Sequence, residues 1–575
     1  MKKNQTELPP ASETEPYLKV IHAFFQSHPQ KSFNARQILA RLELKQKLSL
    51  KTALHCLKIL EEGGQLEEPK IGFYRWAGKH VAYRGILNLL KSGATVSLLD
   101  YPVQEGETQP EVDLFAAEKV KAFSGDEVEV VLQHKRNGLF AKIISVVKRN
   151  KTEFTGILQA DQLSYFFLPD DKSIRTDFYI PRTCLNGAGT GMRVVAKFLN
   201  WKRTLPEAEI IEVLGKIGDH QAEMHAIIRE FGLKTSFSAD AMAEMEQIPD
   251  AIPASEIEKR RDFRQILTVT IDPFDAKDFD DALSFRRLEN GNFEVGVHIA
   301  DVTHYLQEGS ILDQEAADRA TSVYLVDRTL PMLPERLSNH LCSLVPNQDR
   351  LTFASVFELS PAGEIISEWF GRTIIHSARR FTYEEVQEIL DTKTGDHSEA
   401  LLKLNELATR LREKRFAKGS IDFDTDEVKF VLDENGKPLA VKKKIRLNAH
   451  RLIEDFMLLA NQRVARFVFS QTKNKSFPFV YRIHNAPDPE RIQTLKQFVS
   501  YFGHDLITSE DPQEVTQALT KLLLSVQGQP EENIVRQIAI RSMAKAVYST
   551  RNIGHFGLGF QYYTHFTSPI RRYPG

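Results

Sequence analysis

The sequence predicts a multidomain α+β protein with an N-terminal winged helix, two tandem OB or cold-shock β-barrels and a large mixed α/β domain. Three observations predict it. Three helical patterns precede a short strand pair, a repeat of close to 70 residues follows, and alternating strand and helix patterns then fill residues 260–575. The 42% hydrophobic and 26% charged residues are ordinary for a soluble globular protein, and 575 residues suit roughly three to five domains.

The N-terminal segment has the pattern of a small helical module. Residues 1–16 are polar and contain prolines, which predicts a flexible lead. Apolar residues then recur at helical spacing in three stretches, the third with Ser49 as its N-cap. A strand pair across residues 66–76 completes a winged helix-turn-helix over residues 17–80. Such a module contacts nucleic acid or docks to protein, and the pattern leaves both functions open.

An internal repeat predicts the two barrels. Arg84-Gly85-Ile86-Leu87 returns as Thr155-Gly156-Ile157-Leu158, and the pattern of residues 141–147 returns at 208–214. The period suits one small barrel each over residues 82–150 and 151–216. Such barrels bind single strands through basic grooves and stacked aromatic rings, although the same residues also occur as barrel core or a solvated face. The candidate contacts are Lys135, Arg136, Lys148, Arg149, Tyr165, Phe166, Phe167, Lys197, Trp201, Lys202 and Arg203.

Residues 217–259 have a helical, linking pattern, and the large mixed domain follows over residues 260–575. Asn290-Gly291 is a hairpin signal that joins two strand patterns. His298 falls on the small-residue side of the second strand, which favours a hydrogen-bonded core histidine over a metal ligand. Helices are predicted at 383–390, 399–416 and 448–467, and the basic run before the last one suits phosphate contacts.

Four aspartates crowd the loop after a strand pattern at residues 266–271, namely Asp272, Asp278, Asp280 and Asp281. Packing like charges together costs free energy unless a cation lies between them. Mg²⁺ takes carboxylate oxygens and keeps open positions for water and phosphate, and two ions about 4 Å apart suit phosphodiester cleavage. The spacing does not fit a calcium loop that begins at Asp272 or Asp278. The aspartates therefore form either a catalytic metal site or a structural or solvated acidic turn.

Charge, cysteines and hydropathy narrow the class of protein. The formal net charge of −2 does not by itself indicate a protein that binds nucleic acid. Cys56, Cys184 and Cys342 are far apart and lack ligand spacing, which predicts reduced thiols. The N-terminus lacks the pattern of a signal peptide, and no stretch is long and apolar enough to span a bilayer. These features predict a soluble, cytoplasmic protein.

Five motifs in order together resemble the catalytic domain of the ribonuclease II and ribonuclease R family, which is named the RNB type. They are Thr270–Asp281, Val297–Val302, Tyr324–Pro334, His450–Asp455 and His565–Tyr573. The helical module and barrels in front are similar to the ribonuclease R branch. The resemblance implies a processive 3′-to-5′ hydrolytic exoribonuclease that degrades RNA, including structured RNA, to nucleoside 5′-monophosphates. It implies one or two Mg²⁺ ions as cofactor, with Mn²⁺ as a substitute.

The resemblance also implies a role for each matching residue. The metal would be held by Asp272, Asp278, Asp280 and Asp281. Asp280 would be the carboxylate on which the chemical step depends most, and Arg571 would grip the scissile phosphate. The RNA-binding residues would be Tyr324, which stacks on the 3′-terminal base, Tyr383 and Glu454 at the ribose, Phe423 as an opposing clamp, and Arg572. Core packing is the alternative for Tyr383 and Phe423.

The family continues past Tyr573-Pro574 with an aspartate, more catalytic domain and a third OB-type domain, where this sequence has Gly575. The resemblance therefore implies a truncated copy. It leaves a catalytically impaired RNA-binding remnant as the alternative to the exoribonuclease, and a winged-helix DNA-binding regulator as a third hypothesis that rests on residues 17–80 alone. The expected partner is RNA, single-stranded or with a 3′ single-stranded overhang. We expect a monomer that meets the ribosome or the RNA-decay machinery.

Overall fold

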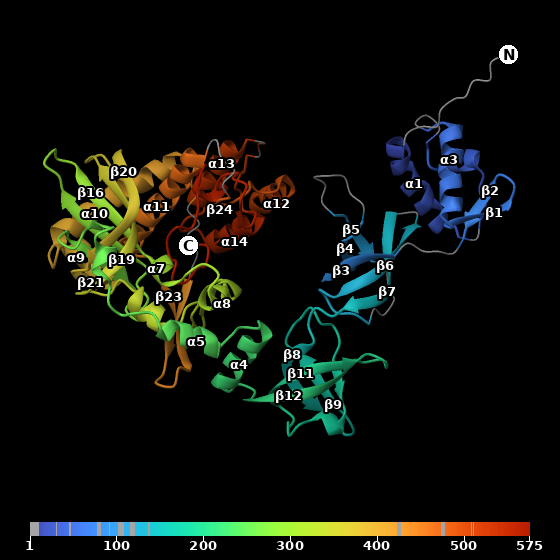
Figure 1. Ribbon diagram of the computed structural model, residues 1–575, viewed down its shortest axis with the longest axis horizontal. Coiled ribbons are helices and arrows are strands. Elements are labelled where there is room, and N and C mark those ends of the chain that lie inside the picture. Colours follow the sequence, from blue (N-terminus) through green and yellow to red (C-terminus); the bar gives the residue numbers. More distant parts are fainter. Residues whose placement is uncertain are drawn as a thin grey trace, which may run out of the picture. The chain divides into compact units, whose positions relative to one another are not determined.

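The chain divides into two compact units, Met1–Gly232 and Leu233–Gly575, in a computed structural model (Figure 1). The structure describes residues 11–575 apart from 30, 45–47, 78–81, 91–92, 102–108, 115–120, 136–137, 422–426, 473–477, 508 and 510. All three cysteines carry free thiols, as predicted. Within the described residues, no helix combines the length and the apolar character needed to cross a membrane.

The first unit begins with three helices and a two-stranded antiparallel sheet. They are α1 (Ala11–Gln26), α2 (Ala35–Arg41), α3 (Leu50–Glu62), β1 (Leu66–Lys70) and β2 (Phe73–Trp76). Ser49 caps α3 by accepting a hydrogen bond from the Thr52 N–H at 3.0 Å, as its sequence position predicts. This element order suits a winged helix, and that assignment stays a prediction. Because α1 begins at Ala11, residues 11–16 are helical where a flexible lead was expected.

Two closed five-stranded barrels follow, which confirms this part of the predicted fold class. Their strands are β3 (Ala82–Leu90), β4 (Gly93–Leu98), β5 (Glu111–Leu114), β6 (Glu127–Lys135) and β7 (Gly138–Lys148), then β8 (Glu153–Ala160), β9 (Tyr165–Pro169), β10 (Phe178–Ile180), β11 (Met192–Asn200) and β12 (Glu207–Lys216). The repeated glycines, Gly85 and Gly156, lie so close to the neighbouring strand that a Cβ atom would collide with its backbone. This close approach explains why the repeat keeps glycine there.

The barrel residues named as candidate RNA contacts divide between core and surface. Phe167 is fully buried in the second barrel, as the core alternative predicts. Arg149 forms an ion pair with the buried Asp126 at 2.5 Å and lies over the Phe123 ring. Arg136 lies outside the described residues. At least two of the candidates therefore have structural partners of their own.

The segment predicted to link barrels and catalytic domain is divided between the two units. Helix α4 (His220–Glu230) belongs to the first unit, where Glu223 pairs with Arg193 of β11. Helix α5 (Ala239–Glu246) belongs to the second unit, where Ala241 and Met245 are buried in its core. Helix α6 (Ala254–Ile257) follows. The second unit thus begins well before residue 260.

A seven-stranded mixed sheet organises the second unit, in the order β13-β20-β19-β16-β15-β14-β21. The strands are β13 (Arg261–Asp262), β14 (Thr268–Asp272), β15 (Asp281–Arg287), β16 (Phe293–Ala300), β19 (Asp349–Leu359), β20 (Ile365–His376) and β21 (Arg379–Thr382). The predicted Asn290-Gly291 turn joins β15 to β16, and Gly291 has a positive φ of 84°. Strand β14 pairs antiparallel with β15 and parallel with β21, so it brings their ends together.

Helices cover both faces of this sheet (Figure 1). One face packs Val295 and Phe357 against α9 (Tyr383–Thr392), α10 (Ser398–Ala417) and α11 (Asn448–Thr472). The other face packs against α5 and α8 (Ile311–Arg319). His298 faces this second side, where its two ring nitrogens bond Ser284 at 2.9 Å and Thr373 at 3.1 Å. It is the buried core histidine that the strand pattern predicts.

The remaining elements are short or lie toward the C-terminus. They are α7 (Val302–Tyr305), β17 (Val323–Tyr324), β18 (Thr329–Leu330), β22 (Glu427–Leu432), β23 (Pro438–Lys444), β24 (Tyr481–Ile483), α12 (Pro489–Ser500), α13 (Pro512–Ser525), α14 (Glu532–Ser542) and β25 (Val547–Ser549), with single turns at Arg182–Cys184, Arg336–Leu341 and Phe556–Leu558. Helices α12–α14 form their own apolar cluster around Leu495, Leu519 and Val535.

Candidate active site

Two of the four aspartates lie at the ends of neighbouring strands. Asp272 is the last residue of β14, and Asp281 is the first residue of β15. Asp272 also stands in register with Thr382, which ends β21 immediately before Tyr383 begins α9. The sheet therefore brings two carboxylates and an aromatic ring to one edge.

Asp272 and Asp281 lie close enough to perturb each other's ionisation. Burial, and after it the charge of Asp281, holds the pKa of Asp272 well above its usual range. Burial raises the pKa of Asp281 to about 6, against the opposing effect of Arg571. Asp272 Oδ2 is buried and has no hydrogen-bond partner among the described residues. A buried carboxylate oxygen that has no hydrogen-bond partner and lies near a second carboxylate would be stabilised by a bound cation.

Asp280 differs because the protein supplies its partners. The residue is 4% exposed, and its Oδ1 accepts a hydrogen bond from the Ile570 N–H at 2.8 Å. Its Oδ2 accepts from Arg571 Nε at 3.3 Å. Burial raises the pKa of Asp280 to about 7, although Arg571 and the Ile570 N–H both lower it. Asp280 is thus a carboxylate clamped between the aspartate loop and a segment 290 residues later.

Asp278 accepts a hydrogen bond from the Tyr324 hydroxyl at 3.1 Å. The Tyr324 residue is nevertheless 54% exposed, so its hydroxyl is anchored while the ring remains accessible. The four aspartates therefore divide into two pairs. Asp278 and Asp280 accept hydrogen bonds from protein donors, and Asp272 and Asp281 are buried carboxylates of which Asp281 raises the pKa of Asp272.

This division bears on the metal that the aspartates could hold. In the part of the chain that the structure describes, no three His, Cys, Asp or Glu side chains form a ready-made metal site. Mg²⁺ does not need one, because it is usually held by one or two carboxylates together with waters and substrate phosphate. Asp272 and Asp281 fit that requirement, and the unpartnered Asp272 oxygen is the group that a cation would satisfy.

Asn461 fixes the segment that carries Arg571. Its buried amide accepts hydrogen bonds from the N–H groups of Phe566 at 2.8 Å and Thr567 at 3.0 Å. Ser568 follows with a positive φ of 64°, and its hydroxyl accepts from Arg571 Nη2 at 2.9 Å. The sequence analysis missed Asn461. The available signal was a polar residue directly after the apolar run of residues 456–460 in a helix.

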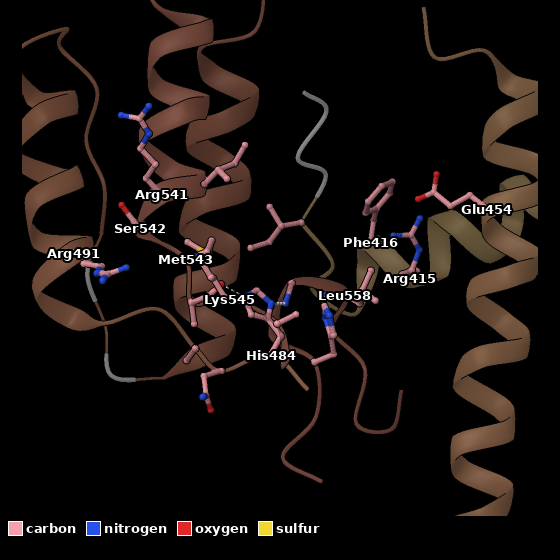
Figure 2. A pocket seen from close by; sticks show the side chains of 18 of the residues that line it. Arg415, Phe416, Glu454, His484, Arg491, Arg541, Ser542, Met543, Lys545 and Leu558 are labelled. Atoms are coloured by element: carbon pink, nitrogen blue, oxygen red, sulfur yellow. Dashed lines mark hydrogen bonds between the residues drawn. The ribbon is translucent and has the colours of Figure 1, made fainter. Parts of the chain in front are cut away.

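The predicted RNA-binding residues are only partly brought together. Tyr383 stacks on His450, with ring centroids 4.0 Å apart. Burial, and after it the charges of Asp281 and Asp272, raises the pKa of Tyr383. Glu454 pairs with Arg446 and lines a cavity that none of the four aspartates lines (Figure 2). Arg572 pairs through its backbone with Thr321. Phe423 lies outside the described residues.

Comparison with known proteins identifies the family. The RNB domain family matches residues 260–574, and the cold shock domain family matches residues 166–238. Ribonuclease R of Thermotoga maritima is 36% identical over 568 residues, which cover 97% of this chain and 78% of that protein. Ribonuclease R of Aquifex aeolicus is 34% identical, with 95% and 77% covered. The chain belongs to the ribonuclease R family. It is therefore an exoribonuclease of the RNB type, in a family that generally depends on divalent metal.

Solved structures agree with membership of the ribonuclease R family. The apo form of Mycoplasma genitalium RNase R matches with a TM-score of 0.76 and 27% identity, over 85% of this chain and 77% of that one. The same enzyme in complex with ribose-methylated single-stranded RNA matches with a TM-score of 0.75 and 26% identity, at the same coverage. Yeast Ssd1, a pseudonuclease, shares the fold at 19% identity, with a TM-score of 0.64 over 90% of this chain and 68% of that one. Because the fold also occurs in a pseudonuclease, the fold alone does not establish catalysis.

Proposed function

We propose that this exoribonuclease is a processive 3′-to-5′ enzyme that releases nucleoside 5′-monophosphates from RNA with Mg²⁺. One observation carries the proposal: the Asp272–Asp281 pair with its unpartnered oxygen, close to the Asp280–Arg571 ion pair. A cation held there would lower the pKa of a water and stabilise negative charge on the phosphodiester. Mn²⁺ would serve in place of Mg²⁺, and one or two ions would be held.

Each member of the site has a role that its contacts support. Asp272 and Asp281 would bind the ion directly. Asp278 and Asp280 would add negative charge around the ion and orient water. Arg571 donates through Nε to Asp280 and through Nη2 to Ser568. Its Nη1 has no protein partner among the described residues and would donate to the scissile phosphate.

The aromatic and polar residues around this site would hold the RNA. The exposed ring of Tyr324 would stack on the 3′-terminal base, a contact that is indifferent to base identity. Tyr383 and Glu454 would contact the ribose, where the 2′-hydroxyl distinguishes RNA from DNA. Phe423 and Arg572 would add a second stacking surface and a phosphate contact.

The first unit would deliver the strand. We infer a winged helix over residues 17–80, barrels over 82–150 and 151–216, and a helical connection over 217–259 leading to the catalytic domain at 260–575. The substrate would be single-stranded RNA or a duplex with a 3′ single-stranded overhang, bound by a monomer. The three free thiols suit the reducing cytoplasm, where the ribosome and RNA-decay machinery would be its neighbours.

The decisive experiment uses 5′-labelled single-stranded RNA with Mg²⁺, this chain and its Asp280→Asn variant. We expect stepwise shortening from the 3′ end by the parent and at least a hundredfold slower shortening by the variant, with RNA affinity retained. RNA binding without shortening by the parent would instead identify a catalytically impaired RNA-binding remnant. Asparagine keeps an acceptor for the Ile570 N–H, so the variant should fold.

Deleting residues 1–80 tests whether the N-terminal helical module helps to digest duplex RNA by holding the unwound end. Digestion of a duplex with a 3′ overhang should slow more than digestion of the single strand. Equal slowing of both substrates would refute a role in holding the unwound end.

A further inference from the structure

The backbone of residues 277–280, a stretch that includes two of the four aspartates, is held by hydrogen bonds from outside the aspartate loop. Two of these bonds are made by the Ser343 hydroxyl, one by the Leu344 N–H and one by the Ala300 N–H. A carboxylate can be placed accurately in a site only if the peptide groups on either side of it are fixed. The groups that hold this stretch therefore help to decide where the two carboxylates lie.

Ser343 holds the chain on both sides of Asp278. Its hydroxyl donates a hydrogen bond to the Lys277 carbonyl at 2.7 Å and accepts one from the Phe279 N–H at 2.9 Å. The carbonyl belongs to the peptide group before Asp278, and the N–H belongs to the peptide group after it. Because φ and ψ are the two soft dihedrals of a residue, rotation about either one turns one of these peptide groups away from the hydroxyl. One side chain thus fixes the backbone conformation of Asp278.

The next two peptide groups are held by backbone donors. The Phe279 carbonyl accepts from the Leu344 N–H at 3.0 Å, and the Asp280 carbonyl accepts from the Ala300 N–H at 2.9 Å. Phe279, Leu344 and Ile570 belong to one buried apolar cluster, and the Ile570 N–H donates to the Asp280 side chain. Asp280 therefore directly follows the residue whose N–H is held by the serine hydroxyl, so a shift of Phe279 would also move Asp280.

Ser343 can hold the loop because its own backbone is held. The residue is fully buried, and its carbonyl accepts a hydrogen bond from Arg350 Nε, in β19, at 2.8 Å. Seven residues before Ser343, Arg336 donates to the carbonyl of Met245, in α5, at 2.7 Å. Residues 336–343 are thus fastened to the sheet at one end and to a helix at the other, and they form a fixed support for the loop.

A hydroxyl group suits this position because one atom supplies both a donor and an acceptor. Alanine at position 343 would leave the Phe279 N–H and the Lys277 carbonyl without their partner in the protein interior, where an unpaired polar group is costly. Cysteine would fill nearly the same space, but its thiol is only a weak donor and a weak acceptor. These two substitutions therefore grade the strength of the two hydrogen bonds.

We propose that Ser343 is a positioning residue for hydrolysis, which fixes the backbone of Asp278 and through Phe279 the place of the Asp280 carboxylate. It acts through the loop backbone and not by contact with the substrate. The proposal rests on the roles proposed above for the aspartates. Ser343 lies outside the five motifs of the family resemblance, so only its contacts in the structure point to it.

The test compares Ser343→Ala with Ser284→Ala in the full chain. Ser284 is the matched control, because its hydroxyl is also buried and bonds the core histidine His298 at 2.9 Å. One measurement is the single-turnover rate on saturating single-stranded RNA with Mg²⁺. The other is the hydrogen–deuterium exchange rate of the Ile570 amide in EDTA, which reports on Asp280 because Ile570 bonds that carboxylate. Melting temperatures establish that both variants fold.

For Ser343→Ala we expect the single-turnover rate to fall at least about tenfold, with the KM for RNA changing less than about threefold, because the misplaced group acts in the chemical step. The Ile570 amide should exchange at least about tenfold faster. For Ser284→Ala both rates should stay within about twofold of the parent, although its melting temperature also falls. Ser343→Cys should give values between those of the parent and Ser343→Ala, and it replaces Ser343→Ala if that variant does not fold.

An unchanged value of either rate in Ser343→Ala would overturn the proposal, and so would equal changes in Ser343→Ala and Ser284→Ala. The Asp280→Asn variant separates this failure from failure of the proposed catalytic site. Normal hydrolysis by Asp280→Asn would remove Asp280 itself from the chemistry. Slow hydrolysis by Asp280→Asn together with normal hydrolysis by Ser343→Ala would overturn only the role of Ser343.

Discussion

Asn461 and Thr567 exchange two hydrogen bonds: Asn461 Nδ2 donates to Thr567 Oγ1 at 3.1 Å, and the Thr567 N–H donates to Asn461 Oδ1 at 3.0 Å. Four residues later in the chain, Arg571 meets Asp280. One buried amide on α11 thus holds the segment that presents the arginine to the aspartate loop.

Asn461→Ala should lower both stability and turnover. It leaves the Phe566 and Thr567 N–H groups without their acceptor, which costs about 1–3 kcal/mol of unfolding free energy. We expect kcat on single-stranded RNA to fall at least tenfold well below the melting temperature, with KM changing less. Thr516→Val is the control, because it removes a buried hydroxyl from α13, away from this segment. An unchanged kcat would show that Asn461 only stabilises the fold.

Arg571→Lys should slow hydrolysis by roughly 10²–10³-fold. Lysine keeps the charge but cannot donate to Asp280 and Ser568 while also reaching a phosphate. Single-turnover rates on labelled RNA measure the effect. Arg551→Lys, at an exposed arginine outside the site, should leave the rate unchanged. Equal rates for the parent and Arg571→Lys would remove Arg571 from the chemical step.

Replacing Tyr324 separates its ring from its hydroxyl. Tyr324→Phe keeps the stacking surface and loses only the hydrogen bond to Asp278, so RNA affinity should be nearly unchanged. Tyr324→Ala removes the ring and should weaken binding of the RNA 3′ end by about 1–3 kcal/mol. Equilibrium binding in EDTA measures both variants. Equal loss in the two variants would mean that the hydroxyl, and not the ring, holds the RNA.

His298 predicts a specific pH dependence of stability. Burial lowers its folded-state pKa to about 3, against an ordinary value of 6.5. Between these values the unfolded chain binds one more proton than the folded chain, so stability falls as the pH drops from 6.5 toward 3 and is constant above 6.5. His298→Gln should remove about 2 kcal/mol of the stability lost by the second unit between pH 7 and pH 5. Denaturant unfolding of both proteins at the two pH values checks this, and an identical loss in both would contradict it.

The fold class could be predicted from the sequence because its signals are local. Ser49 caps α3 by accepting a hydrogen bond from the N–H three residues later, and Asn290-Gly291 closes one hairpin. The barrel repeat places the same glycine at equivalent positions. The boundary within residues 217–259 could not be predicted, because α4 and α5 carry similar helical patterns and differ only in the core against which each packs.

The family resemblance supplies the candidate site as a set of residues and not as an arrangement. The resemblance points to Asp280 and Arg571 alike, yet no local pattern shows that they touch, nor that Asp278 bonds Tyr324. Asp278 and Asp280 differ from Asp272 and Asp281 because their hydrogen-bond donors come from segments far along the chain. Asn461 carries no catalytic signature, so only the packed structure shows what it holds.

The long separation between Asp280 and its partners has a consequence for the order in which the enzyme is made. Asp280 is translated 290 residues before Ile570, which donates to it. At roughly 5–20 residues per second, all four aspartates leave the ribosome about 15–60 s before the arginine that completes their site. Asp280 therefore exists in the growing chain for the time needed to add 290 residues before Ile570 and then Arg571 can contact it.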